Sequence, residues 1–492
     1  MRPSDVAFAI ERARRAAEFA SAGLAPDEAV RWYAQALTIH RAHAAADRRL
    51  EADLLVRLGT AQRDAGHDDH RATLLEAAEL ARAVDDTAVL VEAALANTRG
   101  FFSAAGVVDD ERVAMLEAAV DSVGAGDSSE RSMLLAVLAD ELVYAGDYPR
   151  RRALADEALE IARRIDDKRT LLAVLNHRWA VLNVPENVAE QLAETAEAMR
   201  LAEEVGDPLL QFWAAVYRAV VATQAGEVEE AAVAHDVHAA IATRLAHPTL
   251  RWTSTWMRGN RRYVDGELED AEKLCTDAVN IGLESGQPDA MAIFSGELLA
   301  IRRAQGRVPE VVDLVAMAAD ANPGIPSFRA ALAACYCDLG RTDDALAAIA
   351  PDIESGFDFP YEVVWLFAVE TAAEVVAQLG LVDSARVLLD RLEPFSGQFE
   401  YLGTTSAGAV DHYVALLHAA VGDGPAADAA FERAVALNAR LGAQFFQART
   451  KAAWAAALTT RGDARAAEML ADARTAATAR GYSVLIDRLE GL

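Results

Sequence analysis

The chain has 492 residues, of which 53% are hydrophobic, 25% are charged and only 7% are aromatic. This composition excludes a disordered chain, and abundant alanine with few aromatic residues favours closely packed helices over sheets. The sequence contains 76 Asp and Glu against 47 Lys and Arg, a net charge of −29. Such an acidic excess opposes direct contact with nucleic acid and with anionic membranes.

The amino-terminal residues lack the features of an export signal. Met1 to Ile10 contain acidic and basic residues and no apolar segment of a signal peptide. No uninterrupted apolar stretch approaches the roughly 18 residues of a membrane-spanning helix. The three cysteines, Cys275, Cys335 and Cys337, cannot form a disulfide framework in a chain of this length. We therefore expect a cytoplasmic protein.

A turn of small residues recurs along the chain, in most cases every 40 residues. Each copy centres on a glycine, which tolerates the left-handed backbone conformation that ends a helix. These glycines are Gly66, Gly106, Gly146, Gly226, Gly266, Gly306, Gly340, Gly380, Gly422 and Gly462. The one step of 80 residues spans a degenerate turn near Pro185, two steps are of 34 and 42 residues, and Gly23 opens the series. The repeat predicts about twelve helix pairs.

A small residue follows most of the later glycines after five positions. This spacing predicts that the first turns of each second helix approach the first helix closely. The alanines concerned are Ala231, Ala271, Ala345, Ala385, Ala427 and Ala467, and Val311 is the departure from the rule. The pattern is weaker in the amino-terminal units.

The unit around Gly146 shows the expected pattern in full. Apolar residues recur at helical spacing on both sides of the turn. They are Leu134, Leu138, Leu142 and Ala145 before it, and Leu154, Ala158, Ile161 and Ile165 after it. Asp147 can cap the second helix, and Pro149 suits its first turn. The joint Gly206-Asp207-Pro208 similarly indicates a helix end, a cap and a new helix.

These observations predict an all-α fold, a right-handed superhelical solenoid of tetratricopeptide-like helix pairs with a period of about 40 residues. We expect one continuous solenoid over residues 1–492, because neither helix of a pair can bury its apolar face alone. The period exceeds the roughly 34 residues of tetratricopeptide repeats and approaches that of HEAT repeats, but the glycine-then-alanine pattern favours the former. Irregular loops are expected near 321–328 and 394–408, either as contact loops or as tolerated insertions.

The sequence lacks the common catalytic motifs. There is no phosphate-binding loop, no zinc-binding His-Glu-x-x-His and no Gly-x-Ser-x-Gly nucleophile elbow. The most metal-like segment is His67-Asp68-Asp69-His70, but it occupies a repeat turn, where polar residues belong in any case. His235 and His238 form a weaker candidate. We predict no catalytic residue, no metal and no cofactor.

Aromatic and basic residues interleave on two consecutive predicted first helices, which in tetratricopeptide-like units line the concave surface. Such residues often anchor a partner. The candidate ligand- or partner-binding residues are Trp213, Tyr217, Trp252, Trp256, Arg258 and Arg262. The alternative is that Trp252 and Trp256, one helical turn apart, fill the seam between two units.

Several segments resemble a known family. They include Ser285-Gly286-Gln287-Pro288-Asp289-Ala290, Arg303-Ala304-Gln305-Gly306-Arg307 and Arg440-Leu441-Gly442-Ala443. They look like the C-terminal tetratricopeptide-like arm of large actinobacterial ATPase/cyclase or LuxR-type signalling regulators, which is similar to the sensor superhelix of the maltose-regulon activator class. In that family the arm is joined to a P-loop ATPase module and to a cyclase or DNA-binding domain. Those parts are absent here, so the resemblance implies an arm cut from a larger protein or a freestanding relative.

The resemblance and the repeats together predict a non-catalytic scaffold or sensory arm of a bacterial signal-transduction or transcription-regulating ATPase. Its expected partner is a protein or peptide, including a fused or separate ATPase or cyclase module, with no direct nucleic-acid or membrane contact. The alternative is a small-molecule sensor with its ligand in the concave face near residues 212–263, and a third is a metal-dependent enzyme using His67–His70. A peptide binder requires an extended exposed groove, whereas a small-molecule sensor requires a closed pocket with a few convergent polar groups.

Overall fold

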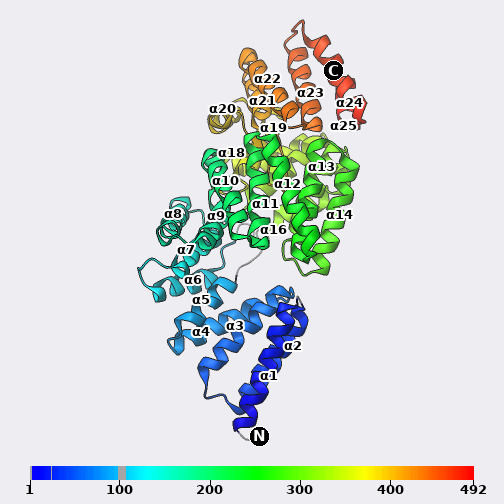
Figure 1. The fold of residues 1–492 in the computed structure, drawn as a ribbon. Helices are drawn as coiled ribbons and strands as arrows, with labels where there is room; N and C mark the ends of the chain where they lie inside the picture. Colours follow the sequence, from blue (N-terminus) through cyan, green and yellow to red (C-terminus); the bar gives the residue numbers. More distant parts are fainter. Residues whose placement is uncertain (1–2, 24, 98–106, 492) are drawn as a thin grey trace. The chain divides into compact units, whose positions relative to one another are not determined.

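The computed structural model describes residues 3–23, 25–97 and 107–491, and most of these lie in helices (Figure 1). The first nine α-helices of the described residues are α1 (Pro3–Ala22), α2 (Pro26–His43), α3 (Arg48–Asp64), α4 (His70–Ala83), α5 (Thr87–Ala96), α6 (Asp110–Val123), α7 (Ser129–Glu141), α8 (Tyr148–Ile165) and α9 (Lys168–Leu182).

The remaining helices follow in the same alternation of helix and turn. They are α10 (Val188–Val205), α11 (Pro208–Ala225), α12 (Val228–Leu245), α13 (Pro248–Asp265), α14 (Leu268–Glu284), α15 (Ala290–Ala304), α16 (Val312–Ala321), α17 (Pro326–Asp338), α18 (Thr342–Glu354), α19 (Trp365–Gln378), α20 (Val382–Leu392), α21 (Val410–Val421), α22 (Gly424–Arg440), α23 (Gln444–Thr460), α24 (Ala466–Arg480) and α25 (Ser483–Glu490). Three short 3-10 turns occur at η1 (Pro185–Asn187), η2 (Val308–Glu310) and η3 (Glu393–Phe395).

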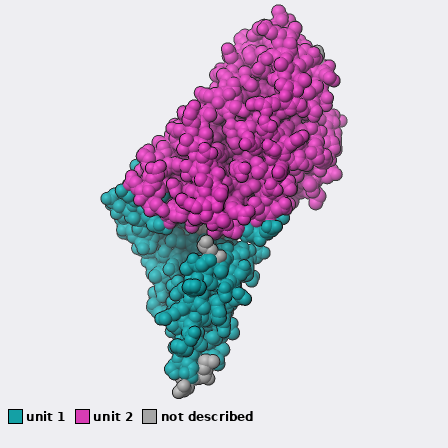
Figure 2. Space-filling view, turned by 45° about the vertical axis from the view of Figure 1, so that its right-hand side comes forward, with its two compact units in different colours: residues 1–181, 282–289 teal, residues 182–281, 290–492 magenta. Residues whose placement is uncertain are grey.

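The chain divides into two compact units (Figure 2). Unit 1 comprises residues 1–181 and 282–289, and unit 2 comprises residues 182–281 and 290–492. Within each unit, consecutive helices pack against one another, for example α1 on α2 and α3 on α4 in unit 1, and α11 on α12 and α21 on α22 in unit 2. The predicted all-α fold of stacked helix pairs is confirmed. That one solenoid continues through the whole chain stays a prediction.

The repeat glycines occupy the turns for which the sequence predicted them. The nine of them within the described residues, from Gly66 to Gly462, each lie between two helices and have φ between 67° and 86°. A β-carbon is disfavoured in this left-handed region, which explains the choice of glycine. Gly106 lies outside the described residues. Gly23 follows α1, but it is not among the glycines of positive φ.

The predicted caps also form. The Asp147 carboxylate accepts a hydrogen bond of 3.0 Å from the Arg150 N–H at the start of α8. At the joint after α10, Gly206 ends the helix with φ 70°, Asp207 accepts the N–H groups of Leu209 and Leu210, and Pro208 begins α11. These caps satisfy N–H groups that the first turn of a helix leaves without partners.

The alanines five positions after the glycines are buried with one exception. Ala271, Ala345, Ala385 and Ala427 have no exposed surface, but Ala467 is exposed, so the prediction is wrong there. The helices that carry the five buried alanines each begin two residues after their glycine, whereas α24 begins four residues after Gly462. Ala467 therefore stands at a different point of the first turn, and Ala473 and Ala477 are the buried alanines of α24.

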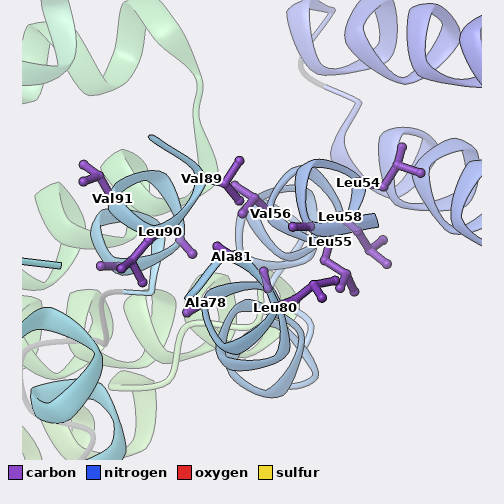
Figure 3. Packing of buried hydrophobic residues seen from close by; sticks show 14 of the residues in the cluster. Leu54, Leu55, Val56, Leu58, Ala78, Leu80, Ala81, Val89, Leu90 and Val91 are labelled. Atoms are coloured by element: carbon purple, nitrogen blue, oxygen red, sulfur yellow. The ribbon is translucent and has the colours of Figure 1, made fainter. Parts of the chain in front are cut away.

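Unit 1 has an apolar core contributed by successive helices. Figure 3 shows part of it, with buried side chains from α3, α4 and α5. Leu54, Leu55 and Leu58 of α3 gather with Leu80 of α4 and Leu90 of α5 in this cluster. Burying one such leucine stabilises the fold by about 1.5–3 kcal/mol, so the stacking of pairs, rather than any single helix, holds the unit together.

Both irregular segments exist. Residues 322–325 separate α16 from α17. The longer insertion, residues 396–409, contains two strands, β1 (Phe399–Glu400) and β2 (Gly408–Ala409), which pair antiparallel with Phe399 opposite Ala409. The sequence did not predict these strands, because two residues are too few to show an alternating pattern. Residues 399–409 are buried except for the half-buried Thr405, so the insertion belongs to the core of unit 2.

Among the described helices, none combines the length and the apolar character that crossing a membrane would require.

Candidate ligand-binding site

Unit 2 contains a cavity of about 160 Å³ lined mainly by the first helices of its pairs. The walls come from α13, α15, α17, α19, α21 and α23, together with α25 and the insertion. Apolar side chains such as Phe328, Phe367 and Phe445 form much of the lining. Arg488 of α25 also lines it and is 44% exposed, so this side of the cavity reaches solvent.

Contacts between distant parts of the sequence close the row of first helices around this cavity. α17 packs on α19 and α19 on α21, while α13 packs on α23. The Arg261 side chain donates to the Leu441 carbonyl at 2.9 Å, and the Tyr482 hydroxyl donates to the Gly266 carbonyl at 3.2 Å. Tyr263 lies edge-on to Phe446 with ring centroids 5.4 Å apart. These contacts hold α13 beside the last helices of the unit.

The insertion fills the space between these helices and is anchored on both sides. On one side, Gln224 donates to the Tyr401 carbonyl at 2.9 Å and Asn260 to the Thr405 carbonyl at 3.2 Å. On the other side, Tyr413 and Arg449 donate to the Ala407 carbonyl at 2.8 and 2.6 Å. Residues 405–407 thereby become part of the cavity wall.

Two arginines of the cavity are neutralised by carboxylates. Arg303 donates to Asp338 at 2.7 Å and to Glu374 at 3.1 Å, and Arg488 donates to Asp338 at 2.7 Å. Burial opposes ionisation of Glu374, but the guanidinium groups of Arg303, Arg449 and Arg488 outweigh it and lower the pKa of this carboxyl to about 2. Glu374 is therefore ionised at neutral pH and paired with Arg303.

Arg449 differs from these two arginines. Its Nη2 donates to the Ala407 carbonyl and, at 3.1 Å, to the Tyr413 hydroxyl, and its guanidinium lies over the rings of Tyr413 and Phe446. Within the described part of the chain it has no carboxylate as a hydrogen-bond or ion-pair partner, and its buried Nε–H has no acceptor. An arginine keeps its charge in proteins. The Arg449 charge interacts with that of Glu374, but the Glu374 carboxylate is hydrogen-bonded to Arg303, so Arg449 itself is a half-buried cation with no directly paired carboxylate.

The glutamates near Arg449 are held in the protonated form. Burial, reinforced by the neighbouring Glu400, raises the pKa of Glu370 well above its ordinary value. Burial also raises the pKa of Glu400 to about 8, although the Ala407 N–H donates to its carboxyl at 2.6 Å. Both groups are mostly neutral at pH 7 and do not balance the charge of Arg449.

The structure places the six predicted binding residues in three different environments. Trp252 and Trp256 are each 7% exposed, with ring centroids 6.2 Å apart. Trp213 and Tyr217 are half-buried and stacked at 5.9 Å, and the side chains of Arg258 and Arg262 are exposed. None of the six is among the residues that line the cavity, whereas the adjacent Tyr263 is. Their binding role stays a prediction.

Reasoning from sequence did not find Arg303, Glu374, Tyr413 or Arg449. Arg303 stood in a repeat turn and the other three on apolar helices, where nothing local distinguishes a cavity residue from a core residue. The one available signal was the loss of regularity at 394–408, which marks the insertion that completes the cavity wall.

The histidines of the two metal-like segments contact other protein groups. His67 contacts Asp27 at 3.1 Å, and the His70 ring lies 2.9 Å from the His67 carbonyl. Across the residues that the structure describes, no group of three or more His, Cys, Asp or Glu side chains is placed to hold a metal ion. His235 and His238 contact each other at 3.1 Å, and burial lowers their pKa values to about 4 and 3, which leaves both neutral at pH 7.

No protein-family model matches the chain, and no curated protein matches it. Solved structures with similar helical folds include the Cut9–Hcn1 hetero-tetramer of the APC/C, with 12% identity, a TM-score of 0.45, and coverage of 95% of this chain and 87% of that chain. A signal-transduction ATPase with a tetratricopeptide-repeat sensor from Pyrococcus horikoshii has 14% sequence identity and a TM-score of 0.39. The match covers 79% of this chain and 55% of that chain. Yeast Tom70 has 13% sequence identity and a TM-score of 0.35, and the match covers 90% of this chain and 95% of that chain. All three TM-scores lie below 0.5, so the fold assignment rests on the helices and contacts described above.

Proposed function

We propose that the chain is a non-catalytic sensory module whose ligand occupies the cavity of unit 2. The observation that carries this proposal is the cavity in which Arg449, a half-buried cation with no directly paired carboxylate, meets a largely apolar wall. Ligand sites are typically concave and mostly apolar, with a few polar groups that fix orientation. Among the functions predicted from the sequence, the geometry thus favours the small-molecule sensor over the peptide scaffold.

The family resemblance suggests how ligand binding would serve signalling. Helical arms of this kind are joined to ATPase switches in the signalling regulators that the sequence resembles. Because the insertion contacts both α13 and α23 and contributes to the cavity wall, a bound ligand could change how these helices are held. We propose that such a change is the signal passed to a fused or separate ATPase module.

A thermal-unfolding screen tests the proposal. The purified chain is unfolded with a panel of organic acids, amino acids, sugars and nucleotides. A ligand at one hundred times its dissociation constant stabilises the native state by about 2.7 kcal/mol, which gives a measurable shift of the midpoint. Ala300 on α15 lines the cavity, so Ala300→Leu should fill part of it and remove the shift.

The matched control is Ala292→Leu, the same change at an exposed position of the same helix. It should leave the ligand-induced shift intact. A panel without any shift, or a shift that Ala300→Leu does not reduce, would contradict the proposal.

A second candidate function, binding of a protein or peptide, is favoured by a partly exposed row of side chains on α11. Leu209, Trp213 and Tyr217 stand at intervals of four residues, and Leu209 is 47% exposed while the two aromatic rings are stacked and half-buried. Residues at this spacing share one face of a helix. Arg258 and Arg262, the two arginines predicted to bind, are exposed on α13.

Affinity isolation with the wild type and with the double variant Trp213→Ala/Arg258→Ala tests this second candidate. A specific partner should be lost with the variant and kept with the control Leu346→Ala, which changes an exposed apolar residue of α18. If the double variant retains every partner of the wild type, the α11 row does not bind them.

A further inference from the structure

We propose that the ligand of the unit 2 cavity is a small organic monocarboxylate, bound through its carboxylate by Arg449 and through its apolar part by the aromatic wall. This inference rests on the proposed function and specifies the ligand class of that same site. The balance of charges in the cavity, the position of Arg449 and the cavity volume support it.

The cavity has an excess of one positive charge. Three guanidinium groups, those of Arg303, Arg449 and Arg488, line it with two carboxylates, those of Asp338 and Glu374. The ion pairs of Arg303 and Arg488 account for both carboxylates. One further negative charge is therefore required for neutrality, and Arg449 is the group that needs it.

The position of Arg449 determines where the negative charge of a ligand would lie. The guanidinium lies over the rings of Tyr413 and Phe446, 5.5 and 5.0 Å from the ring centroids, and it donates to the Ala407 carbonyl. A cation fixed in this way loses little further freedom on binding, because its position is already set. The planar guanidinium of an arginine can bind a carboxylate through two parallel hydrogen bonds, which the ammonium group of a lysine cannot do.

A monoanion fits this site better than a dianion such as phosphate. Asp338 and Glu374 are ion-paired and only 8% exposed, and they remain in the wall when the ligand binds. A second negative charge on the ligand would find no unpaired cation among the residues lining the cavity and would be repelled by these two carboxylates. The net charge of −29 over the whole chain adds to that repulsion.

The remainder of the ligand must be small and apolar. The cavity volume of about 160 Å³ is close to that of an engineered cavity of about 150 Å³ that binds benzene. Phe328, Phe367 and Phe445 provide aromatic walls. Together these features indicate an acid with a short alkyl chain or a single ring.

Calorimetric titration with pairs of probes tests the inference. The probes are butyrate and benzoate, each compared with its neutral isostere, butyramide or benzamide, at pH 7 on the full chain. We expect at least one carboxylate to bind, with a dissociation constant about 10-fold to 100-fold below that of its amide, because a hydrogen bond to a charged group is worth that much. Arg449→Gln should abolish the preference, whereas Arg386→Gln, the same change at an exposed residue of α20, should keep it.

The results distinguish failure of the carboxylate assignment from failure of the cavity as a ligand site. If amides bind as tightly as the carboxylates and Ala300→Leu blocks both, the carboxylate assignment is overturned while the cavity remains a ligand site. Binding of no carboxylate also overturns the assignment, and the unfolding screen then decides the function separately. If Arg449→Gln does not fold, the comparison of acid with amide on the wild type alone still supports or overturns the carboxylate assignment.

Discussion

Asp147 shows how a single side chain sets a helix boundary in this protein. Its carboxylate accepts the Arg150 N–H, and Pro149 occupies the first turn of α8. The sequence predicted this role because an acidic residue directly follows the turn glycine. Such caps can be recognised locally, since donor and acceptor are three residues apart.

Replacing Asp147 by alanine should lower the free energy of unfolding by about 1 kcal/mol, the usual effect of losing a side-chain cap. Asp147→Asn should recover most of the loss, because the amide oxygen also accepts the N–H. Urea unfolding followed by circular dichroism measures both variants. Equal destabilisation by alanine and asparagine would show that the hydrogen bond is not the source of the effect.

Glu400 should make the stability of unit 2 depend on pH. Burial raises its pKa from an ordinary value near 4.5 to about 8, so the folded state binds this proton more tightly than the unfolded state does. The stability gained from the group is then fully present below about pH 4.5 and is lost as the pH rises through about 8.

The variant Glu400→Gln keeps a neutral side chain of the same shape at every pH. Between pH 5 and pH 9 it should lose less stability than the wild type, by on the order of 4 kcal/mol, as measured by chemical unfolding at each pH. Parallel pH profiles of the two proteins would mean that Glu400 does not titrate in this range.

At the scale of elements, the insertion depends on glycines at close contacts. Gly408 has φ 98°, and a β-carbon there would lie 2.6 Å from the Phe446 ring. Gly397 has φ 89°, but a β-carbon there would meet nothing within 4 Å. An alanine at either position would have the same unfavourable left-handed backbone conformation. Only at position 408 would its β-carbon also clash with the Phe446 ring.

Gly408→Ala should therefore lower the free energy of unfolding by about 1–3 kcal/mol more than Gly397→Ala does, since overpacking adds to the backbone cost. Equilibrium unfolding of both variants gives the difference. Similar losses for the two would indicate that Phe446 moves aside without cost and that the insertion is loosely packed.

The repeat helices could be predicted from the sequence, whereas the site could not. Gly226 and Gly266, with the joint at Gly206-Asp207-Pro208, act on the residues next to them, so their effect can be inferred from the local sequence. The cavity depends on pairs such as Arg261 with Leu441 and Gln224 with Tyr401, which lie 180 and 177 residues apart. No single segment contains both partners of such a contact, so the local sequence around Arg449 does not distinguish a cavity residue from a core residue.

At the scale of the whole molecule, the chain is two compact units of helix pairs, and the candidate ligand site lies within unit 2 alone. Unit 1 contributes none of the residues that line the cavity. Ligand binding should therefore leave the local stability of the unit 1 core, such as α3 and α4, unchanged, because its hydrogen bonds and buried side chains are separate from the site.

Hydrogen–deuterium exchange of the full chain, with and without a ligand from the screen, shows whether the ligand occupies the cavity of unit 2. Ligand binding should slow exchange in the insertion, residues 396–409, and in α25, Ser483–Glu490, with no change in α3 and α4 and no protection in Ala300→Leu. Protection confined to the α11 row, or to unit 1, would contradict the account and would place the ligand outside the cavity.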